Sequence, residues 1–361
     1  MSAWSIRVPL LPDESISSWL TRSAIAQGCD PLVLTGALWP KWRIWTTDPD
    51  RGIEPGRLRA LARASGIPES EFLSASLRPV IEAAAGRPLV VRSSWPWLLA
   101  LGSRNLKRQG GIQYCQACLA EDRTPYFRAQ WRLTWHVCCS KHGLWLSDRC
   151  PFCGAPVEPH RLEAHDGSLA TCATCKATLG RSCADMAQPV AAALQQAADS
   201  AVKVKHASYG DRLLPASDWF KLIRHFVVLI RRASAHPSSG LGRAMRLLSV
   251  DLNAVGAVSP GLPVELLSVA ERALLMQGAW QVLNAGEHQL MQVARDTGLS
   301  TTAISGCDSA VPSTQGPLPS LAQSGRRQAK ATRMAITKPR PKRSVQIAWA
   351  YLQRRFRSTL R

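Results

Sequence analysis

Cysteine and histidine residues at the spacing of metal ligands are concentrated between Gln113 and Cys175, a stretch that holds eight of the eleven cysteines. Two residues between ligands let a tight turn aim both side chains at one ion, and Zn(II) binds four such ligands in a tetrahedron. One C-x2-C pair alone would also fit a redox dithiol, but four half-sites in one stretch indicate metal binding. The half-sites are Cys115 with Cys118, Cys139 with His142, Cys150 with Cys153, and Cys172 with Cys175.

Their order along the chain predicts two four-ligand sites, the first two half-sites forming one and the last two the other. A site with four protein ligands is closed to water and substrate, so the prediction is two structural Zn(II) ions per chain. Cys138 could replace Cys139 with C-x3-H spacing to His142, but C-x2-H matches the other half-sites. Four residues are expected to be spare: His136, His160, His165 and the thiol of Cys183.

The residues between the ligands also carry a family resemblance. The run Y-C-x-x-C-L-A-E-D-x-x-P-Y-F-R-x-x-W-R-L-x-W-x-x-x-C-x-x-H-G-L-x-L-x-D-R-C-P-x-C-G-A-P resembles the TniQ family of bacterial transposition proteins. The run L-P-D-E-S-I-S-S-W-L-T-R-x-A (Leu11 to Ala24) resembles the opening of the same domain. Together these matches cover roughly the first half of the chain. The family usually has proline after the first cysteine, where this chain has Gln116, which concerns the shape of the turn and not the ligand set.

The resemblance implies a target-site selector in DNA transposition. Such a protein binds a target DNA element, or a targeting complex such as a CRISPR effector, and recruits an AAA+ ATPase that loads the transposase. The resemblance also implies zinc-stabilised N-terminal modules, helical C-terminal modules and often a homodimer.

Composition supports a nucleic-acid partner independently. The 361 residues carry a formal net charge of +20, and a chain this basic usually binds a polyanion. No apolar run reaches transmembrane length, and the first residues lack the apolar core of a signal peptide. The protein is therefore expected in the bacterial cytoplasm, associated with the nucleoid and not with a membrane, where reduced cysteines favour metal binding over disulfides.

The predicted fold class is mainly α, with the two small zinc-ribbon or knuckle-like sites embedded among helix-turn-helix-like modules. The expected domains are an N-terminal helical part (1–110), a double zinc region (111–183), a C-terminal helical domain (184–308), and a basic linker and tail (309–361). Residues 31–55 are expected to be irregular. Apolar periodicity predicts a helix in 10–27, where Asp13 is the expected N-cap, and a helix-turn-helix in 57–77. It also predicts helices in 95–106, 128–137, 185–199, 217–232 and 265–283.

Two segments are the candidates for DNA contact. Residues 289–305 fit a helix-turn-helix whose second helix starts at Ser300 and presents Thr301 and Thr302 near its N-terminus. Residues 326–361 hold twelve Lys and Arg and no carboxylate, which suits non-specific phosphate binding. The candidates in this tail are Arg326, Arg327, Lys338, Arg340, Lys342, Arg343, Arg354 and Arg355. In the 57–77 pair, the acidic Glu69 and Glu71 on the second helix disfavour DNA contact.

Two other functions fit parts of the pattern. A zinc-containing transcription regulator would share the zinc modules, the helix-turn-helix patterns and the basic tail. A zinc-dependent hydrolase or nuclease would need an open metal site or an acidic cluster, and the sequence has neither H-E-x-x-H nor a phosphate-binding G-x-x-x-x-G-K-[ST]. The adjacent Glu121 and Asp122 are better explained by capping or by pairing with Arg123 or Arg128, so the chain is predicted not to be an enzyme.

Overall fold

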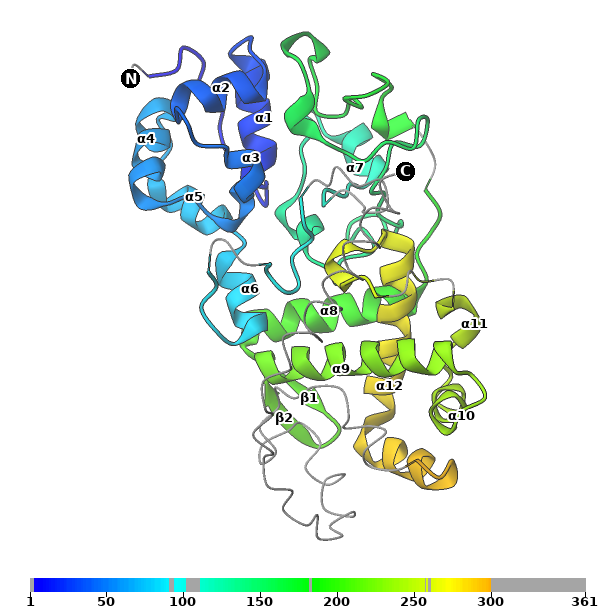
Figure 1. Cartoon of the computed structure of the whole chain (residues 1–361). Helices are drawn as coiled ribbons and strands as arrows, with labels where there is room; N and C mark the ends of the chain where they lie inside the picture. The colour runs from blue at the N-terminus through cyan, green and yellow to red at the C-terminus, as the bar shows by residue number, and fades with distance from the viewer. Residues whose placement is uncertain are drawn as a thin grey trace, which may run out of the picture. The chain divides into compact units, whose positions relative to one another are not determined.

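The computed structural model describes residues 3–90, 94–101, 111–181, 184–256, 258 and 261–299. This part of the chain is mainly helical, which confirms the predicted fold class (Figure 1). Its only sheet is the antiparallel hairpin of β1 (His206–Tyr209) and β2 (Arg212–Pro215). No helix within these ranges combines the length and the apolar character needed to cross a membrane.

The N-terminal helices pack around one apolar core. They are α1 (Ile16–Ala26), α2 (Pro31–Leu38), α3 (Ile44–Thr47), α4 (Pro55–Ser65) and α5 (Glu69–Ala75). Trp19 of α1 is fully buried in this core and meets Phe72 of α5 edge to face at 4.9 Å. The predicted helix-turn-helix is present as α4 and α5, and Gly66 between them has the positive φ of 75° that ends α4.

Two predictions in this part were wrong. The N-cap of α1 is Ser15, whose Oγ accepts a hydrogen bond from Ser18 N at 3.1 Å. Asp13 instead lies two residues upstream with a φ of 58°, and its carbonyl accepts from Ala129 N, so it joins α1 to the metal region. Residues 31–55 are not irregular, because Pro31 occupies the first turn of α2, where its fixed φ favours a helix.

The segments 95–106 and 128–137 were wrongly predicted as helices. Residues 95–101 are not helical, and 102–106 lie outside the described residues. Within 128–137 only a short 3-10 turn, η2 (Ala129–Arg132), is helical. The two segments run side by side instead, since Leu98 bridges to Leu133 and Thr134 N donates to Trp97 O at 2.9 Å.

The C-terminal helices surround α9 (Ala216–Ala235), which contacts the β1–β2 hairpin and the other helices of this part. These helices are α8 (Pro189–Val204), α10 (Gly240–Leu247), α11 (Leu252–Val255) and α12 (Val269–Asp296). The predicted apolar stripe of α9 is buried throughout, from Trp219 to Ile230. Helix α6 (Arg78–Ala85) follows α5 in sequence but packs on α8 and α9 (Figure 1).

Helix α12 begins later and runs further than predicted. Ser268 and Glu271 form a capping box at its start, whereas Glu265 lies in the preceding 3-10 turn η6 (Val264–Leu266). Gly286, which has a φ of 74°, kinks the helix beyond the predicted end at 283. The helix therefore continues to Asp296 in a new direction.

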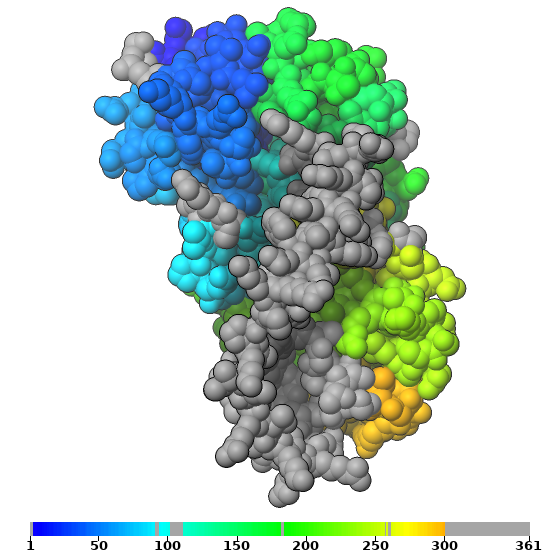
Figure 2. Space-filling view, in the orientation of Figure 1, coloured from blue at the N-terminus to red at the C-terminus, as the bar shows by residue number. Residues whose placement is uncertain are grey.

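The N-terminal helices lie beside the region of the last four cysteines, as the blue and green surfaces of Figure 2 show. Helices α1 and α2 contact the 3-10 turns η3 (Pro159–Arg161) and η4 (Ala164–Asp166) of that region. Ala164 N donates to Asp30 Oδ1 at 2.8 Å, which fixes the start of α2 against it.

Candidate metal centres

The first four predicted ligands converge on one point. The ligand atoms of Cys115, Cys118, Cys139 and His142 all lie within 4.8 Å of one another. Nδ1 of His142 is 3.4, 3.3 and 3.6 Å from the three sulfurs in that order, and the sulfurs of Cys118 and Cys139 are 3.7 Å apart. The three cysteines are buried and the histidine is half-buried.

The last four predicted ligands form a second cluster of the same size. Sγ atoms of Cys150 and Cys175 are 3.6 Å apart, and those of Cys153 and Cys172 are 3.8 Å apart. Cys150 and Cys172 are buried, whereas Cys153 and Cys175 are exposed. The second cluster therefore lies closer to the surface than the first.

These distances fit a tetrahedral ion. With Zn–S near 2.3 Å and Zn–N near 2.0–2.1 Å, the edges of the tetrahedron are about 3.8 Å for S···S and about 3.5–3.6 Å for S···N. The observed separations of 3.3–3.8 Å are close to these values. A disulfide would bring two sulfurs to about 2.05 Å, and the clustered cysteines are free thiols. Either cluster could thus hold one metal ion.

Three of the four half-sites share one backbone turn. The N–H of the first ligand residue donates to the carbonyl five residues on, and its own carbonyl accepts from the N–H four residues on. That fourth residue has a positive φ of 62–70°, which favours the glycines found at two of the three positions. The donor pairs are Cys139 N to Leu144 O and Gly143 N to Cys139 O, Cys150 N to Ala155 O and Gly154 N to Cys150 O, and Cys172 N to Ala177 O and Lys176 N to Cys172 O, all at 2.8–2.9 Å.

The remaining half-site has a different local structure. Cys115 is the N-cap of helix α7 (Gln116–Glu121), and Cys118 lies in the first turn of that helix. Gln116 occupies the first helical position, where proline is well tolerated, so either residue suits this site. Its side-chain amide donates to Ser147 Oγ at 3.0 Å. The departure from the family pattern therefore changes an outer contact and leaves the ligand geometry intact.

Cys138 and Cys139 point to different places. Cys139 joins the first cluster, while the thiol of Cys138 donates to Gln195 Oε1 of α8 at 3.5 Å. Gln195 also holds the backbone of Cys138, donating to its carbonyl and accepting from its N–H. The geometry thus favours Cys139 as the ligand.

Glu121 orients the histidine of the first cluster, a role that sequence reasoning missed. Its Oε2 lies 2.9 Å from Nε2 of His142 and 2.7 Å from Nζ of Lys141. A carboxylate that accepts from the outer ring nitrogen leaves the other nitrogen free to bind a metal. Asp122 forms a bidentate pair with Arg128 at 2.6 and 2.7 Å, as predicted for that carboxylate. The sequence signal for this role was the acidic residue Glu121, which directly precedes Asp122 in the run L-A-E-D.

The first cluster favours a cation electrostatically. Hydrogen bonds with Cys115 and then Cys139, together with burial, raise the pKa of Cys118 well above its ordinary value. Three thiolates cannot share this space without a compensating positive charge. A divalent ion would supply that charge and would favour the deprotonated form of the coordinating thiols.

The three spare histidines lie outside both clusters, as predicted. His136 Nε2 lies 2.8 Å from Asp199 Oδ1. His160 stacks on Trp45 at 5.4 Å, and burial followed by the nearby Arg161 lowers its pKa to about 4. His165 is exposed on the surface. Cys183 lies outside the described residues.

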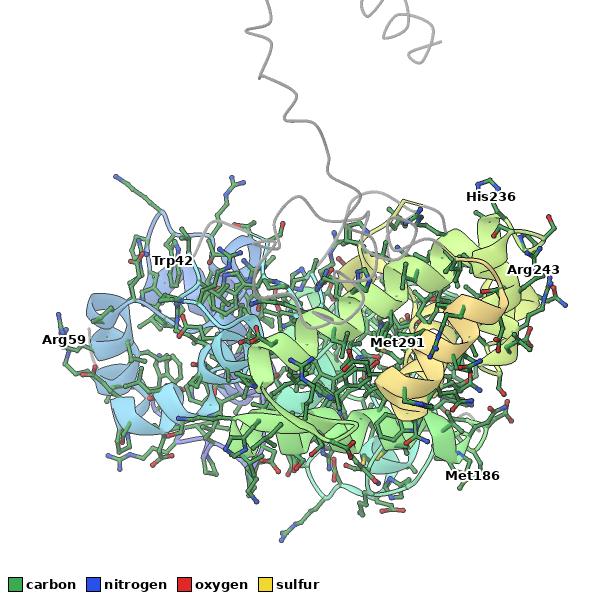
Figure 3. The ribbon with its side chains drawn as sticks, turned by 90° about the horizontal axis from the view of Figure 1, so that it is seen from below. Trp42, Arg59, Met186, His236, Arg243 and Met291 are labelled. Carbon is green, nitrogen blue, oxygen red and sulfur yellow. The ribbon has the colours of Figure 1, made fainter. Side chains whose placement is uncertain are left out.

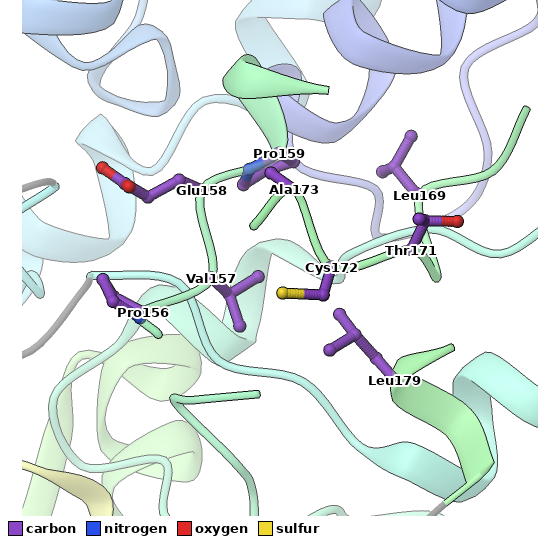
Figure 4. Close-up of a pocket in the computed structure, with 9 residues that line it drawn as sticks. All are labelled: Pro156, Val157, Glu158, Pro159, Leu169, Thr171, Cys172, Ala173 and Leu179. Atoms are coloured by element: carbon purple, nitrogen blue, oxygen red, sulfur yellow. The ribbon is translucent and has the colours of Figure 1, made fainter. Parts of the chain in front are cut away.

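A very small cavity adjoins the second cluster. The cavity has a volume of about 10 Å³, room for about one water molecule, and Val157, Cys172 and Leu179 are among its lining residues (Figure 4). The local surroundings therefore suit a structural ion.

The candidate DNA contacts fall mostly outside the described residues. Ser300, Thr301, Thr302 and every candidate in the tail lie there, so their roles stay predictions. The first helix of the predicted pair is the C-terminal part of α12, where Leu290, Val293 and Ala294 are buried. Gly298 follows with a φ of 66°, the conformation expected of the turn.

Two buried arginines connect the metal region to the helices on either side of it. Arg132, 1% exposed, pairs with Asp48, the N-cap of η1 (Pro49–Arg51), and with Asp50 within it, and donates to Leu99 O at 2.7 Å. Arg272 of α12 is also 1% exposed and donates to the carbonyls of Thr134 and His136 at 2.6 and 3.0 Å. Burial lowers the pKa of Arg272 to about 10, so it remains a charged donor at neutral pH.

Comparison with known proteins agrees with this arrangement. The TniQ family matches residues 5–146, which span the N-terminal helices and the whole first cluster but end before Cys150. A search of curated proteins found no match. The match over residues 5–146 supports a TniQ family transposition protein and a function related to transposition.

Proposed function

We propose that the protein is an adaptor that selects target sites for DNA transposition. In this role it binds target DNA, or a targeting complex such as a CRISPR effector, and recruits an AAA+ ATPase that regulates the transposase. The observation that carries the proposal is the TniQ match, which extends over the complete first metal cluster. TniQ is a family of adaptor-type transposition proteins and not a known enzyme family.

The metal in both clusters is proposed to be Zn(II). Thiolate and imidazole donors at tetrahedral spacing suit zinc, which has no redox chemistry and no geometric preference of its own. Cys115, Cys118, Cys139 and His142 would hold one ion, and Cys150, Cys153, Cys172 and Cys175 the other. Because each ion takes four protein ligands, both would stabilise the fold and neither would activate a water molecule.

DNA is the proposed direct partner. Residues 289–305 would use Ser300, Thr301 and Thr302 near a helix N-terminus, where backbone N–H groups favour phosphate. The basic tail would add contacts that do not depend on sequence. A homodimer would let two copies bind one target, as the family resemblance implies.

The testing experiment is capture of the AAA+ ATPase that we expect to be encoded beside this gene, with and without DNA, by the purified full chain. Metal content is measured on the same sample. The expected result is two zinc ions per chain and retention of the ATPase. A Cys150→Ser variant should lose one ion and the stability of the metal region, because metal binding there is folding free energy.

Cys29→Ser is the matched control, since Cys29 is a free thiol outside both clusters. It should keep both ions and the ATPase. If the protein carries two ions and binds a specific DNA sequence tightly but does not capture the ATPase, the result would favour a transcription regulator over an adaptor. Fewer than two ions in the wild-type chain would contradict the ligand assignment.

A further inference from the structure

Five cations gather on and beside the outward face of α4 without a carboxylate partner in the described part of the chain. Arg59 and Arg63 lie one turn apart on this exposed face, with Nε of Arg63 3.4 Å from the carbonyl oxygen of Arg59. Arg59 projects outward at the edge of the molecule in Figure 3. The other three are Arg7, Lys41 and Arg43, all exposed.

The surrounding elements hold these cations along the helix. The side chain of Arg7 lies against Gly66, at the C-terminal end of α4. Lys41 and Arg43 flank Trp42, whose ring lies 4.2 Å from the guanidinium of Arg57 near the N-terminal end of α4. The cations therefore follow the whole length of α4, whose eleven residues span about 16 Å.

Five carboxylates of this part of the chain are engaged elsewhere. Glu14 pairs with Arg22 at 2.5 Å, and Glu54 pairs with Arg57 at 2.6 Å. Asp48 and Asp50 are buried with Arg132, and Asp30 accepts from Ala164 N. Internal pairing thus engages these five acidic groups and does not neutralise the cations on and beside α4.

We propose that this α4 surface, defined by Arg7, Lys41, Arg43, Arg59 and Arg63, binds the phosphate backbone of double-stranded DNA. Along the DNA axis, its length of about 16 Å corresponds to about five phosphates of one strand, since each strand carries one phosphate per 3.4 Å of axis. Helix α5 carries Glu69 and Glu71 in its first turn, so the acidic second helix of the pair is unsuited to reading a groove. The contact therefore positions the protein on DNA and does not read sequence.

This inference rests on the proposed function in one respect, that DNA is a direct partner. It adds a second contact at the opposite end of the described chain from the helix-turn-helix of 289–305. A protein held at two places would keep one orientation on its target, which a selector of insertion sites requires.

The test is an Arg59→Gln/Arg63→Gln double variant of the full chain. Binding to a fluorescent 30-base-pair duplex of random sequence is measured from 50 to 200 mM salt. Each lost phosphate contact flattens the slope of log K against log salt by about 0.9, so two flatten it by about 1.8. At 0.15 M salt the same two contacts correspond to about 30-fold weaker binding. Glutamine keeps helix propensity near that of arginine.

The matched control is Arg123→Gln/Arg181→Gln, which removes the same charge from two exposed positions on or beside neighbouring elements of the metal region. The slope of log K against log salt for this control variant should equal that of the wild type. Arg59→Lys/Arg63→Lys should restore the wild-type slope, because a point charge suffices for phosphate. Equal losses in the control and in the α4 variant would mean a net-charge effect and would overturn the proposal.

The outcomes separate this proposal from the proposed function. Wild-type binding that is unchanged in the Arg59→Gln/Arg63→Gln variant would overturn the α4 surface and leave the adaptor role intact. No DNA binding by the wild type even at 50 mM salt would overturn DNA as a direct partner, and the α4 surface with it. Retained ATPase capture by the variant shows that it is folded.

Discussion

The adjacent cysteines at 138 and 139 offer the sharpest test of the metal assignment. Cys139→Ser removes a ligand atom of the first cluster, whereas Cys138→Ser removes only a thiol that donates to Gln195 Oε1 at 3.5 Å. The two changes are chemically identical and one residue apart, and both side chains are buried. Any difference between the variants therefore reports the metal and not the chemistry of the substitution.

The expected effects differ by an order of magnitude. A structural Zn(II) contributes about 10–16 kcal/mol of binding free energy at pH 7 in small finger modules. That is comparable to the whole stability of a domain, about 5–15 kcal/mol. Cys139→Ser should therefore lose one ion and unfold the surroundings of the first cluster. Cys138→Ser should cost about 1 kcal/mol, because a serine hydroxyl can still donate to the glutamine.

The assay is metal content per chain together with thermal unfolding. Wild type and Cys138→Ser should carry two zinc ions and unfold within a few degrees of each other, whereas Cys139→Ser should carry one. One ion in Cys138→Ser and two in Cys139→Ser would refute the assignment. Two ions in both variants would refute the closed four-ligand site.

Three further perturbations test other parts of the argument. Arg132→Met should lower the free energy of unfolding by about 3–5 kcal/mol at neutral pH, because it leaves buried carboxylates unpaired. Burial already raises the pKa of Asp50, so this loss of stability should shrink as the pH falls towards the ordinary pKa of aspartate. Urea unfolding at pH 5 and pH 7.5 measures the difference. A deficit that grows in acid would contradict this. Glu121→Gln should weaken metal binding at the first cluster by about 10–100-fold in chelator competition, because it alters the carboxylate that orients His142, and unchanged competition would remove that role. Deletion of residues 326–361 should flatten the salt dependence of DNA binding, and an equal slope would show that the tail makes no phosphate contacts.

The ligand positions could be predicted because their geometry is local. A turn of four residues sets the separation of the two ligands within each C-x2-C or C-x2-H pair, and the sequence shows those four residues directly. The buried stripe of α9 was predictable for the same reason, since helical periodicity relates residues three and four apart. The N-cap of α1 was not, because Asp13 is held by Ala129, over a hundred residues away.

The wrongly predicted helices fail for a related reason. Trp131 and Trp135 have helical spacing, yet Trp131 packs near Phe127 in the core of the metal region while Trp135 packs against Phe220 of α9. The 3-10 turn η2 and the irregular residues after it send the two side chains to different cores, whereas an α-helix would place both on one face. Apolar spacing alone does not distinguish one buried face from two separate cores.

The limits of the family match do not coincide with the limits of the stable structure. Residues 134–138 lie inside the matched range, but their buried carbonyls accept hydrogen bonds from Arg272 of α12 and Gln195 of α8, which lie outside it. Each buried carbonyl left without a donor would cost about 1–3 kcal/mol. Val269 N, at the start of α12, also donates to Asp148 Oδ2 in the link between the two clusters. The C-terminal helices therefore complete the metal region.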